Sequence, residues 1–295
     1  MSSQKTEYGV MVGVDGSPAS DAAVWWGARE AMMRNIPLSL VHVANPGAST
    51  WAQAPLLDEF AKWQESEGRG MLANASKIAH DAATGAENPI AINTELLFSA
   101  TVPTLVELSH KADLVVVGTD GRGALTRGLL GSVSSELLRQ AHCPVAVVRD
   151  EEPRTQDRAQ APVLVGIDHS PSSELALKIG FDEASRRHVG LVALHAWSDR
   201  ELVELPGIDW PAVKAEEERL LSEALAGWQE RYPDVTVTKR LLCDRPAHAL
   251  VDTSGAAQLV VVGSHGRNMV SRMMLGSVSH AVVQSVHRPV IVARP

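Results

Sequence analysis

Short apolar runs alternate along the chain with longer segments whose apolar residues have helical spacing. In the first half the runs predict strands at 8–14, 38–43, 90–98, 114–118 and 145–149. Between them the spacing predicts helices at 18–35, 57–83, 102–110 and 132–140. Strands that alternate with helices favour right-handed crossovers, and so a mostly parallel sheet with helices on both faces.

This pattern occurs twice in the chain. The segment VGVDGSPAS at 12–20 matches VGIDHSPSS at 165–173, and CPVAVV at 143–148 matches RPVIVA at 288–293. The later match has the shorter offset, so we expect the second half to lack about eight residues in a connecting segment. Between the halves, residues 151–162 are charged, contain proline and lack large apolar side chains, as is typical of a linker. We therefore predict domains at 1–150 and 163–295, joined by a linker at 151–162.

Composition narrows the function classes. The 295 residues fit two domains of ordinary size, and the formal net charge of −8 argues against broad nucleic-acid binding. The N-terminal stretch lacks the apolar run of a signal peptide, and no run reaches membrane-spanning length. We expect a cytoplasmic protein without a membrane span.

Two glycine-rich loops carry the clearest chemical signal. The segments VVVGTDGRGALTRGLLGS at 115–132 and VVVGSHGRNMVSRMMLGS at 260–277 each run from a predicted strand to a predicted helix. Thirteen residues separate Gly118 from Ser132, whereas strand-to-helix loops in such folds usually have about 2–6. Glycines allow close approach of the backbone to a ligand, a helix start offers N–H groups to an anion, and arginine suits phosphate. The loops therefore predict phosphate binding by Gly118, Gly121, Arg122, Arg127, Gly131 and Ser132, and by Gly263, Gly266, Arg267, Arg272, Gly276 and Ser277. The alternative is that these glycines and serines only form turns and helix caps.

Further candidates lie at the ends of the first two predicted strands of each half. They are Gly13, Asp15, His42 and Val43 in the first half, and Gly166, Asp168, His195 and Ala196 in the second. In open α/β sheets, ligands bind at the carboxyl ends of the strands. An aspartate there can accept hydrogen bonds from a base or ribose, or order a metal-bound water; the alternative is a turn aspartate that caps the next helix. We interpret the two histidines as hydrogen-bonded strand-end residues rather than catalytic bases.

Several nucleotide and hydrolase motifs are absent from the sequence. No lysine precedes Ser132 or Ser277, so the Walker motif is excluded, and neither G-x-G-x-x-G after the first strand nor G-x-S-x-G is present. The candidate catalytic groups of the first half are Asp15 and Asp120, and the second half has His265 in place of Asp120. The sequence therefore favours binding over turnover. A slow ATPase or nucleotidyl transferase, and a nucleotide-independent interaction module, are the alternatives.

The pattern G-x-x-G, nine residues, G-[ST] resembles the ATP-binding branch of the universal stress protein family, and both loops match it in full. The likeness covers nearly the whole chain twice, as in tandem-domain members from mycobacteria and other actinobacteria. It implies two Rossmann-like α/β domains, each with a five-stranded parallel sheet of order 3-2-1-4-5, which pair through their last strands. It also implies ATP, with Mg²⁺ held through the phosphates, a further homodimer, unknown protein partners and a regulatory role in stress, hypoxia or dormancy.

The resemblance also assigns residues. It implies that the triphosphate lies against Gly121, Arg122, Gly123, Gly131 and Ser132, with adenine and ribose near Gly13, Asp15, Val43 and Gly118. The matching residues of the second half are Gly166, Asp168, Ala196, Gly263, Gly266, Arg267, Gly276 and Ser277. Asn268 replaces Gly123 and His265 replaces Asp120, so we expect the two sites to differ in affinity or metal dependence, with the first the more typical.

Overall fold

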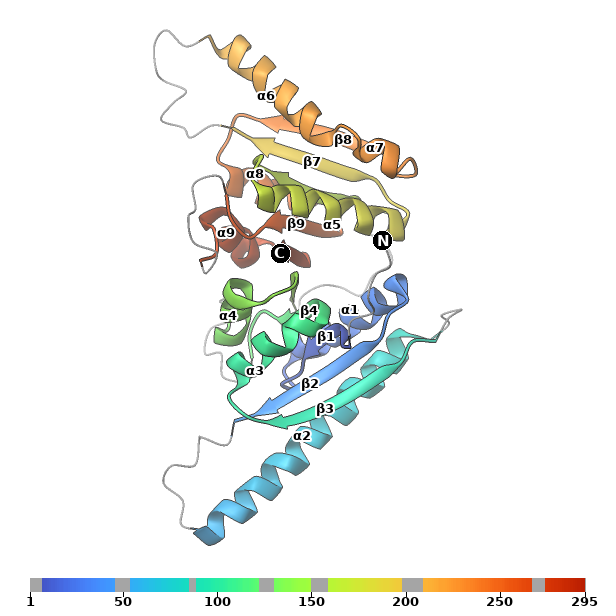
Figure 1. The fold of residues 1–295 in the computed structure, drawn as a ribbon, viewed down its shortest axis with the longest axis vertical. Coiled ribbons are helices and arrows are strands. Elements are labelled where there is room, and N and C mark those ends of the chain that lie inside the picture. Colours follow the sequence, from blue (N-terminus) through green and yellow to red (C-terminus); the bar gives the residue numbers. More distant parts are fainter. Residues whose placement is uncertain are drawn as a thin grey trace. The chain divides into compact units, whose positions relative to one another are not determined.

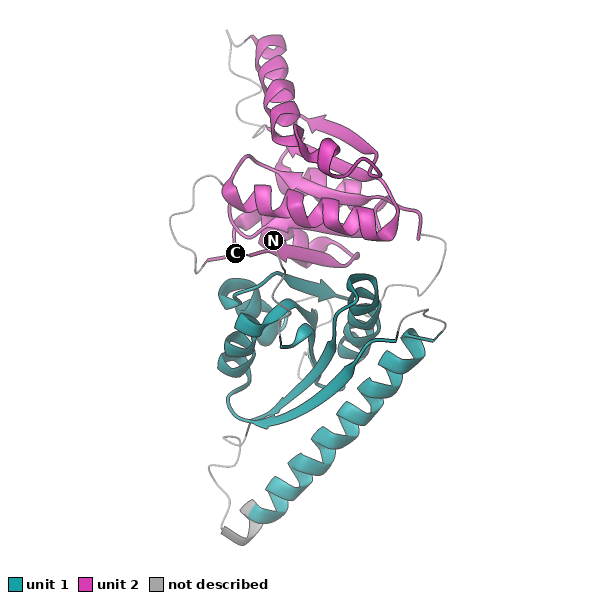
Figure 2. Cartoon of the chain, turned by 45° about the vertical axis from the view of Figure 1, so that its right-hand side comes forward, with its two compact units in different colours: residues 1–150 teal, residues 151–295 magenta. Residues whose placement is uncertain are grey.

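A computed structural model describes residues 7–45, 54–84, 89–121, 130–149, 159–197, 209–266 and 274–294. The chain divides into two compact units, residues 1–150 and 151–295, which are coloured separately in Figure 2. Each unit is built from one set of parallel strands flanked by helices. The predicted α/β class is confirmed.

Unit 1 contains a five-stranded parallel sheet. Its strands are β1 (Gly9–Gly13), β2 (Leu38–Ala44), β3 (Ile92–Phe98), β4 (Ala112–Gly118) and β5 (Val145–Val148). They lie in the order β3-β2-β1-β4-β5, and each neighbouring pair is parallel. The helices are α1 (Pro18–Arg34), α2 (Ala54–Ala82), α3 (Thr101–Leu108), the short 3₁₀ helix η2 (Ser109–Lys111) and α4 (Ser132–Gln140).

Unit 2 repeats this topology. Its strands are β6 (Val163–Ile167), β7 (Leu191–Ala196), β8 (Val237–Leu242), β9 (Leu259–Gly263) and β10 (Val290–Ala293), in the order β8-β7-β6-β9-β10. Its helices are α5 (Pro171–Arg187), α6 (Trp210–Leu225), α7 (Trp228–Arg231), α8 (Pro246–Ser254) and α9 (Ser277–Ser285). The predicted order 3-2-1-4-5 therefore holds in each unit.

Chain direction explains where the site lies. From β1 the chain passes outward through β2 and β3, then returns to place β4 and β5 on the other side of β1. Right-handed crossovers then put α1 and α2 on one face of the sheet, and α3 and α4 on the other. The contacts between α1 and α2 and between α3 and α4 agree with this arrangement (Figure 1). The carboxyl ends of β1 and β4 consequently flank the point where the strand order reverses, which is where ligands bind in such sheets.

Local sequence accounts for the first helix of each unit. Ser17 precedes α1 and its Oγ accepts a hydrogen bond from the Ser20 N–H at 3.1 Å, while Pro18 occupies the first turn. Ser170 caps α5 in the same way at 3.2 Å. A serine cap accepts a hydrogen bond from an N–H group that has no partner within the helix, and a proline in the first turn has no N–H group to satisfy. Both residues are therefore typical of helix starts.

The two units differ in the crossover between their second and third strands. In unit 1 this crossover contains the 29-residue helix α2, whereas unit 2 has α6 with 16 residues and α7 with 4. Gly227, between α6 and α7, has φ of +78°, in the left-handed region that interrupts a helix. The shortening predicted for connecting segments therefore affects the helix as well.

An aromatic cluster in unit 2 accompanies this difference. Phe181 on α5 is fully buried and stacks on Trp228 and Tyr232, with ring centroids 5.4 Å from each. The matching position of unit 1 is Ala28, on the helix against which α2 packs. The aromatic cluster therefore supplies apolar packing where unit 2 has the shorter helices.

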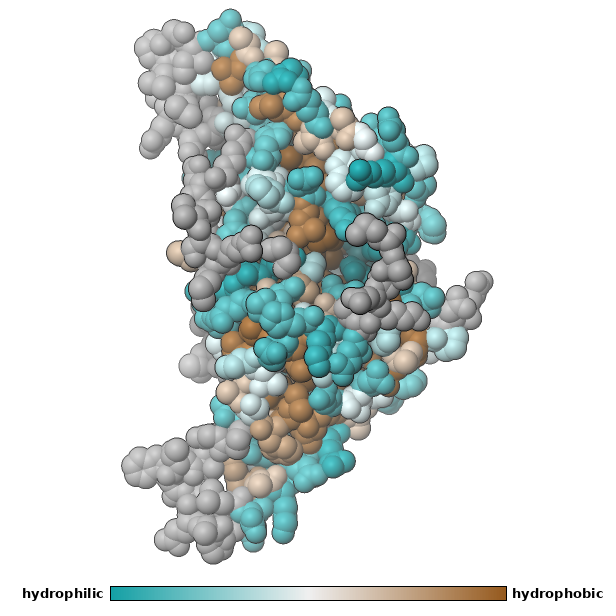
Figure 3. All heavy atoms as spheres, viewed as in Figure 1, coloured by the Kyte–Doolittle hydropathy of each residue, from teal (hydrophilic) through white to brown (hydrophobic). Residues whose placement is uncertain are grey.

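The surface seen in Figure 3 is mixed, with hydrophobic areas broken by hydrophilic residues. The exposed large hydrophobic residues among the described ones are Trp63, Phe98 and Met274. Scattered apolar residues of this kind are normal on globular proteins. Among the described helices, none combines the length and the apolar character needed to cross a bilayer.

Both tyrosines of the chain are predicted to titrate unusually late. Tyr8 donates a hydrogen bond to Glu95 at 2.9 Å, and Tyr232 donates one to Asp182 at 2.7 Å. Burial, together with the bonded carboxylate, raises the pKa of each phenol to about 12. Tyrosinate absorbance of the folded protein should therefore rise near pH 12, and that of the urea-unfolded chain near pH 10.

The same shift predicts how alkali affects stability. Because the folded pKa lies above the unfolded one, this stabilising contribution is complete below about pH 10 and is lost as the pH rises toward 12. Tyr8→Phe should remove half of the absorbance change and make the pH dependence of the unfolding free energy shallower. A folded-state titration centred at pH 10 would contradict both hydrogen bonds.

Candidate functional site

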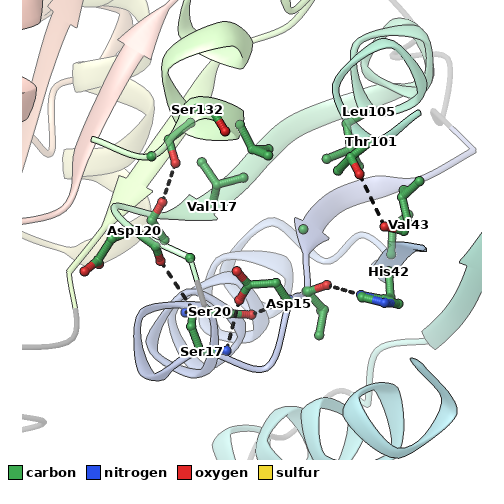
Figure 4. Close-up of a pocket in the computed structure, with 18 residues that line it drawn as sticks. Asp15, Ser17, Ser20, His42, Val43, Thr101, Leu105, Val117, Asp120 and Ser132 are labelled. Atoms are coloured by element: carbon green, nitrogen blue, oxygen red, sulfur yellow. Dashed lines mark hydrogen bonds between the residues drawn. The ribbon is translucent and has the colours of Figure 1, made fainter. Parts of the chain in front are cut away.

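A cavity of about 270 Å³ opens at the carboxyl edge of the unit 1 sheet (Figure 4). Its wall combines the ends of β1, β2 and β4 with the starts of α3 and α4. All the first-half site residues predicted from the sequence that lie within the described chain line it: Gly13, Asp15, Val43, Gly118, Gly121, Gly131 and Ser132. Its volume is close to the lower end of the usual range for ligand pockets, about 300–1,000 Å³. The predicted residues Arg122, Gly123, Arg127, Arg267 and Arg272 lie outside the described residues.

One end of this cavity is formed by the start of α4. The N-cap residue is Gly131, which has no side chain, so the N–H groups of the first helical turn are left to other partners. The Gly131 N–H donates to Thr119 O at 2.6 Å, and Ser134 Oγ donates to Gly118 O at 2.7 Å. These bonds hold the helix start against the end of β4. The arrangement suits an anion, because backbone N–H groups and the helix dipole both favour negative charge there.

Close backbone packing at the end of β4 explains one of the loop glycines. A Cβ atom on Gly118 would lie 2.7–2.9 Å from the backbone and Cβ of Ala19 in α1. Any side chain would therefore force the end of β4 away from the start of α1. Glycine at this position keeps the two edges of the cavity together.

Asp15 holds the turn after β1 and also lines the cavity. Its Oδ1 accepts a hydrogen bond from the Ser17 N–H at 2.9 Å and so holds the turn, although the helix cap is Ser17. Its Oδ2 lies on the side of Gly121, where a Cβ would approach it to 2.6 Å. Ser17 Oγ in turn donates to Asp120 O at 3.3 Å, which links the first turn to the glycine loop (Figure 4).

The other end of the cavity is largely apolar. Val41, Val43, Leu105 and Val117 contribute to its wall. Thr101 Oγ1 donates to Val43 O at 3.4 Å, and the His42 ring donates from Nδ1 to Val14 O at 2.7 Å. His42 is thus hydrogen-bonded to the backbone at the strand end, as predicted.

Sequence reasoning missed the lining residues that belong to α1 and α3. These are Ser17, Ser20, Thr101 and Leu105. The sequence pattern identifies the serines only as part of a helix start. Thr101 and Leu105 carry no motif, and only the return crossover from β3 brings them to the cavity.

Unit 2 repeats the hydrogen bonds of this edge. Ser170 Oγ donates to His265 O at 3.2 Å, the Gly276 N–H donates to Ser264 O at 2.8 Å, and Ser279 Oγ donates to Gly263 O at 2.6 Å. The remaining predicted residues of this half also lie at the sheet edge: Gly166, Asp168 and Ala196 at the ends of β6 and β7, and Gly266 and Ser277 at the two described ends of the loop. The Cβ of a residue at Gly266 would lie 3.0 Å from Asp168 Oδ2, which matches the relation of Gly121 to Asp15.

The two edges differ in the second residue after the last strand glycine, which is Asp120 in unit 1 and His265 in unit 2. In unit 1, Thr119 Oγ1 donates to the Asp120 carboxylate at 2.9 Å. In unit 2, Ser264 Oγ and His265 Nδ1 form a hydrogen bond of 2.7 Å instead. The second edge therefore has an imidazole where the first has a carboxylate.

Comparisons with known proteins agree with this architecture. The model of the universal stress protein family matches residues 9–149 and 161–294. Universal stress proteins Rv2005c and Rv2623 of Mycobacterium tuberculosis strain H37Rv are 58% and 51% identical to the chain over 294 residues, covering 100% of it and 99% of each relative. The crystal structure of a universal stress protein from Archaeoglobus fulgidus is similar in fold, with a TM-score of 0.69 at 19% identity, covering 98% of this chain and 99% of that one. The chain belongs to the universal stress protein family.

Proposed function

We propose that this protein binds ATP at the carboxyl edge of each sheet and acts as a nucleotide-dependent regulator. The observation that carries the proposal is the convergence of seven predicted residues on one cavity: Gly13, Asp15, Val43, Gly118, Gly121, Gly131 and Ser132. They come from four separate stretches of sequence, and each has a chemistry that suits a nucleotide. Convergence of this kind at a strand-order reversal is typical of nucleotide sites.

The two ends of the cavity suit the two ends of ATP. The N–H groups at the start of α4 suit the phosphates, and Mg²⁺ would be held through those phosphates. The valine and leucine wall suits adenine, and we assign to Asp15, which lines the same cavity, the acceptance of hydrogen bonds from ribose hydroxyl groups. The family resemblance adds Arg122, Gly123 and Arg127 to the phosphate end. In unit 2 the equivalent edge binds a second ATP, with an affinity altered by His265.

Regulation is a better proposal than catalysis. In the unit 1 cavity the candidate catalytic carboxylates are Asp15, which accepts the Ser17 N–H, and Asp120, which accepts Thr119 Oγ1. Both carboxylates therefore already accept hydrogen bonds within the protein, and unit 2 has His265 at the position of Asp120. A regulator needs ATP to bind one conformation or assembly more tightly than another. We propose that partners recognise the ATP-stabilised state in the cytoplasm, during stress or dormancy, in a chain that also forms homodimers.

Nucleotide analysis and calorimetry test this proposal together. Heat release and mass spectrometry of the purified protein should show ATP, and titration of nucleotide-free protein with Mg-ATP should saturate near two equivalents per chain. Turnover should stay below about one per minute, at the slow end of enzyme catalysis. Faster turnover would favour a slow ATPase or nucleotidyl transferase. Absence of both co-purified nucleotide and binding heat would favour an interaction module that only inherits the loops.

A further inference from the structure

Three side chains with metal-binding atoms meet in unit 2; two of them adjoin Asp168 and Ala196 in sequence, but none of the three is a residue that we assign to the nucleotide. His169 follows β6, His195 lies on β7, and Glu217 lies on α6. One ligand atom from each lies within 4.8 Å of the other two. Two imidazoles and one carboxylate are a donor set used by zinc sites, which often have three protein ligands and an open position.

We propose that His169, His195 and Glu217 bind a divalent transition-metal ion of the zinc class. Ligand atoms of a tetrahedral zinc ion, at distances of about 2.0–2.2 Å from it, are separated by about 3.3–3.6 Å. His195 Nε2 and Glu217 Oε2 are already 3.0 Å apart. The rings of His169 and His195 are neighbours, with centroids 4.9 Å apart. Small side-chain movements therefore suffice to bring all three groups around one ion.

The hydrogen bonds of His195 orient its metal-binding nitrogen. Its Nδ1 donates to Ile167 O at 2.7 Å, because a carbonyl oxygen can only accept. With Nδ1 as a donor, the 3.0 Å hydrogen bond between Nε2 and the Glu217 carboxylate needs a second ring proton, and a metal ion would take the place of that proton. A metal ion between Nε2 and the carboxylate is then attracted to both. A backbone carbonyl that fixes the other ring nitrogen is also a usual feature of metal-bound histidine.

Burial strengthens this inference. The His195 side chain is 2% exposed and that of Glu217 is 19% exposed, so the pair is largely removed from solvent. Surface carboxylates and histidines often lie near each other without a function. A buried pair next to a second imidazole has lost much more hydration, which an ion can replace.

The first unit shows that the cluster is not a requirement of the fold. The matching histidine, His42, makes the same hydrogen bond to the backbone, at 2.7 Å. The position of His169 is occupied there by Gly16, and both residues have positive φ, +62° and +73°. On the helix side, Gly68 faces the ring of His42, because a Cβ atom on this glycine would lie 3.0 Å from His42 Cδ2. Unit 1 therefore keeps one of the three ligands and has glycine at or near the positions of the others.

The backbone at His169 is also unusual. A left-handed φ is costly for a residue with a side chain, and such residues tend to occur at functional sites. In unit 2 this backbone conformation is combined with an imidazole that lies beside His195, whereas unit 1 has a glycine at the matching position. His169 also lines a cavity of about 620 Å³ between α5 and the helices α6 and α7. An ion bound by His169 would therefore have one of its three ligands in the wall of this cavity.

Zinc binding by variants of the tag-free full chain tests the proposal. Chelator-treated, nucleotide-free protein is titrated with Zn²⁺ against a chromogenic chelator, and Co²⁺ absorbance reports the ligand geometry. We expect one tight equivalent per chain in the wild type. His169→Gly and Glu217→Gln should each weaken it at least about 100-fold, more than the usual loss of a partner that only orients a ligand.

Matched controls separate this site from adventitious binding and from misfolding. His248 is exposed and lies 2.7 Å from Asp244, so His248→Ala removes another histidine–carboxylate pair and should leave the tight equivalent unchanged. His169→Gly places glycine at a positive φ and should preserve or raise the metal-free melting temperature. Absence of a tight equivalent in the wild type, its retention in either ligand variant, or its loss in His248→Ala would overturn the proposal.

Discussion

Replacing Gly131 and Gly276 together by alanine is expected to reduce ATP affinity by at least about 100-fold at both sites without unfolding the protein. A Cβ on either glycine would stand at the N-cap of the helix whose N–H groups we assign to the phosphates. Losing two charge-assisted hydrogen bonds, each about 1.5–3 kcal/mol, is enough for an effect of this size. Calorimetric titration with Mg-ATP measures it directly.

The structure explains why the fold should survive these substitutions. A Cβ on Gly131 would be 3.4 Å from Thr119 O, and one on Gly276 would be 3.4 Å from Ser264 O, so neither clashes severely. Both glycines have backbone angles that alanine adopts readily, with φ of −64° and −62°. The single variants should each weaken one of the two binding events by a similar factor, which assigns the tighter site to its unit.

Gly70→Ala is the matched control for these variants. Gly70 lies on α2, and no atom lies within 4 Å of the Cβ it would gain. This substitution should leave ATP affinity unchanged and stabilise the helix by up to about 1 kcal/mol. Wild-type affinity in the Gly131/Gly276 double variant would contradict the assignment of the loops to the phosphates.

The second large effect is expected from Phe181→Ala in unit 2. Phe181 is fully buried and stacks on Trp228 and Tyr232, so alanine removes a ring and leaves a cavity between α5 and α7. Substitutions of this kind cost about 3–5 kcal/mol. Urea unfolding followed by circular dichroism measures the loss.

Phe98→Ala provides the control for this prediction. Phe98 is the same residue type but is 48% exposed at the end of the edge strand β3. Its loss should cost about 1 kcal/mol or less, because half of the ring is already in water. Equal effects of the two substitutions would show that the aromatic cluster does not replace the packing that α2 supplies in unit 1.

The two units share the hydrogen bonds at the carboxyl edge of the sheet but differ in one of the helices that pack on the sheet. The bonds that tie the glycine loop to the first turn recur in both, from Ser17 to Asp120 O and from Ser170 to His265 O. The helix between the second and third strands does not recur, because α6 and α7 replace the longer α2. The shared hydrogen bonds therefore lie at the carboxyl edge, while the shortened crossover contributes Glu217 and part of the wall of the second cavity in unit 2.

Much of the architecture was predictable because its signals are local. The apolar runs identify β1 and β4, and Ser17 with Pro18 marks the start of α1 within a few adjacent residues. The glycine loops were identified from their repeated motif, and the sheet order followed from the family resemblance. The gathering of Gly13, Gly118 and Gly131 at one cavity followed from parallel strands, whose carboxyl ends share one edge.

The sequence by itself determined the strands, the helix starts, the repeat and the loop edge of the site, since each depends on neighbouring residues or on a direct match between the halves. Only the tertiary structure decided which side chains far apart in sequence become neighbours. Thr101 reaches the first cavity through the return crossover, and Glu217 reaches His195 because α6 packs on β8, which pairs with β7. No local pattern encodes such contacts, because they depend on how helices pack against the sheet once the whole unit has folded.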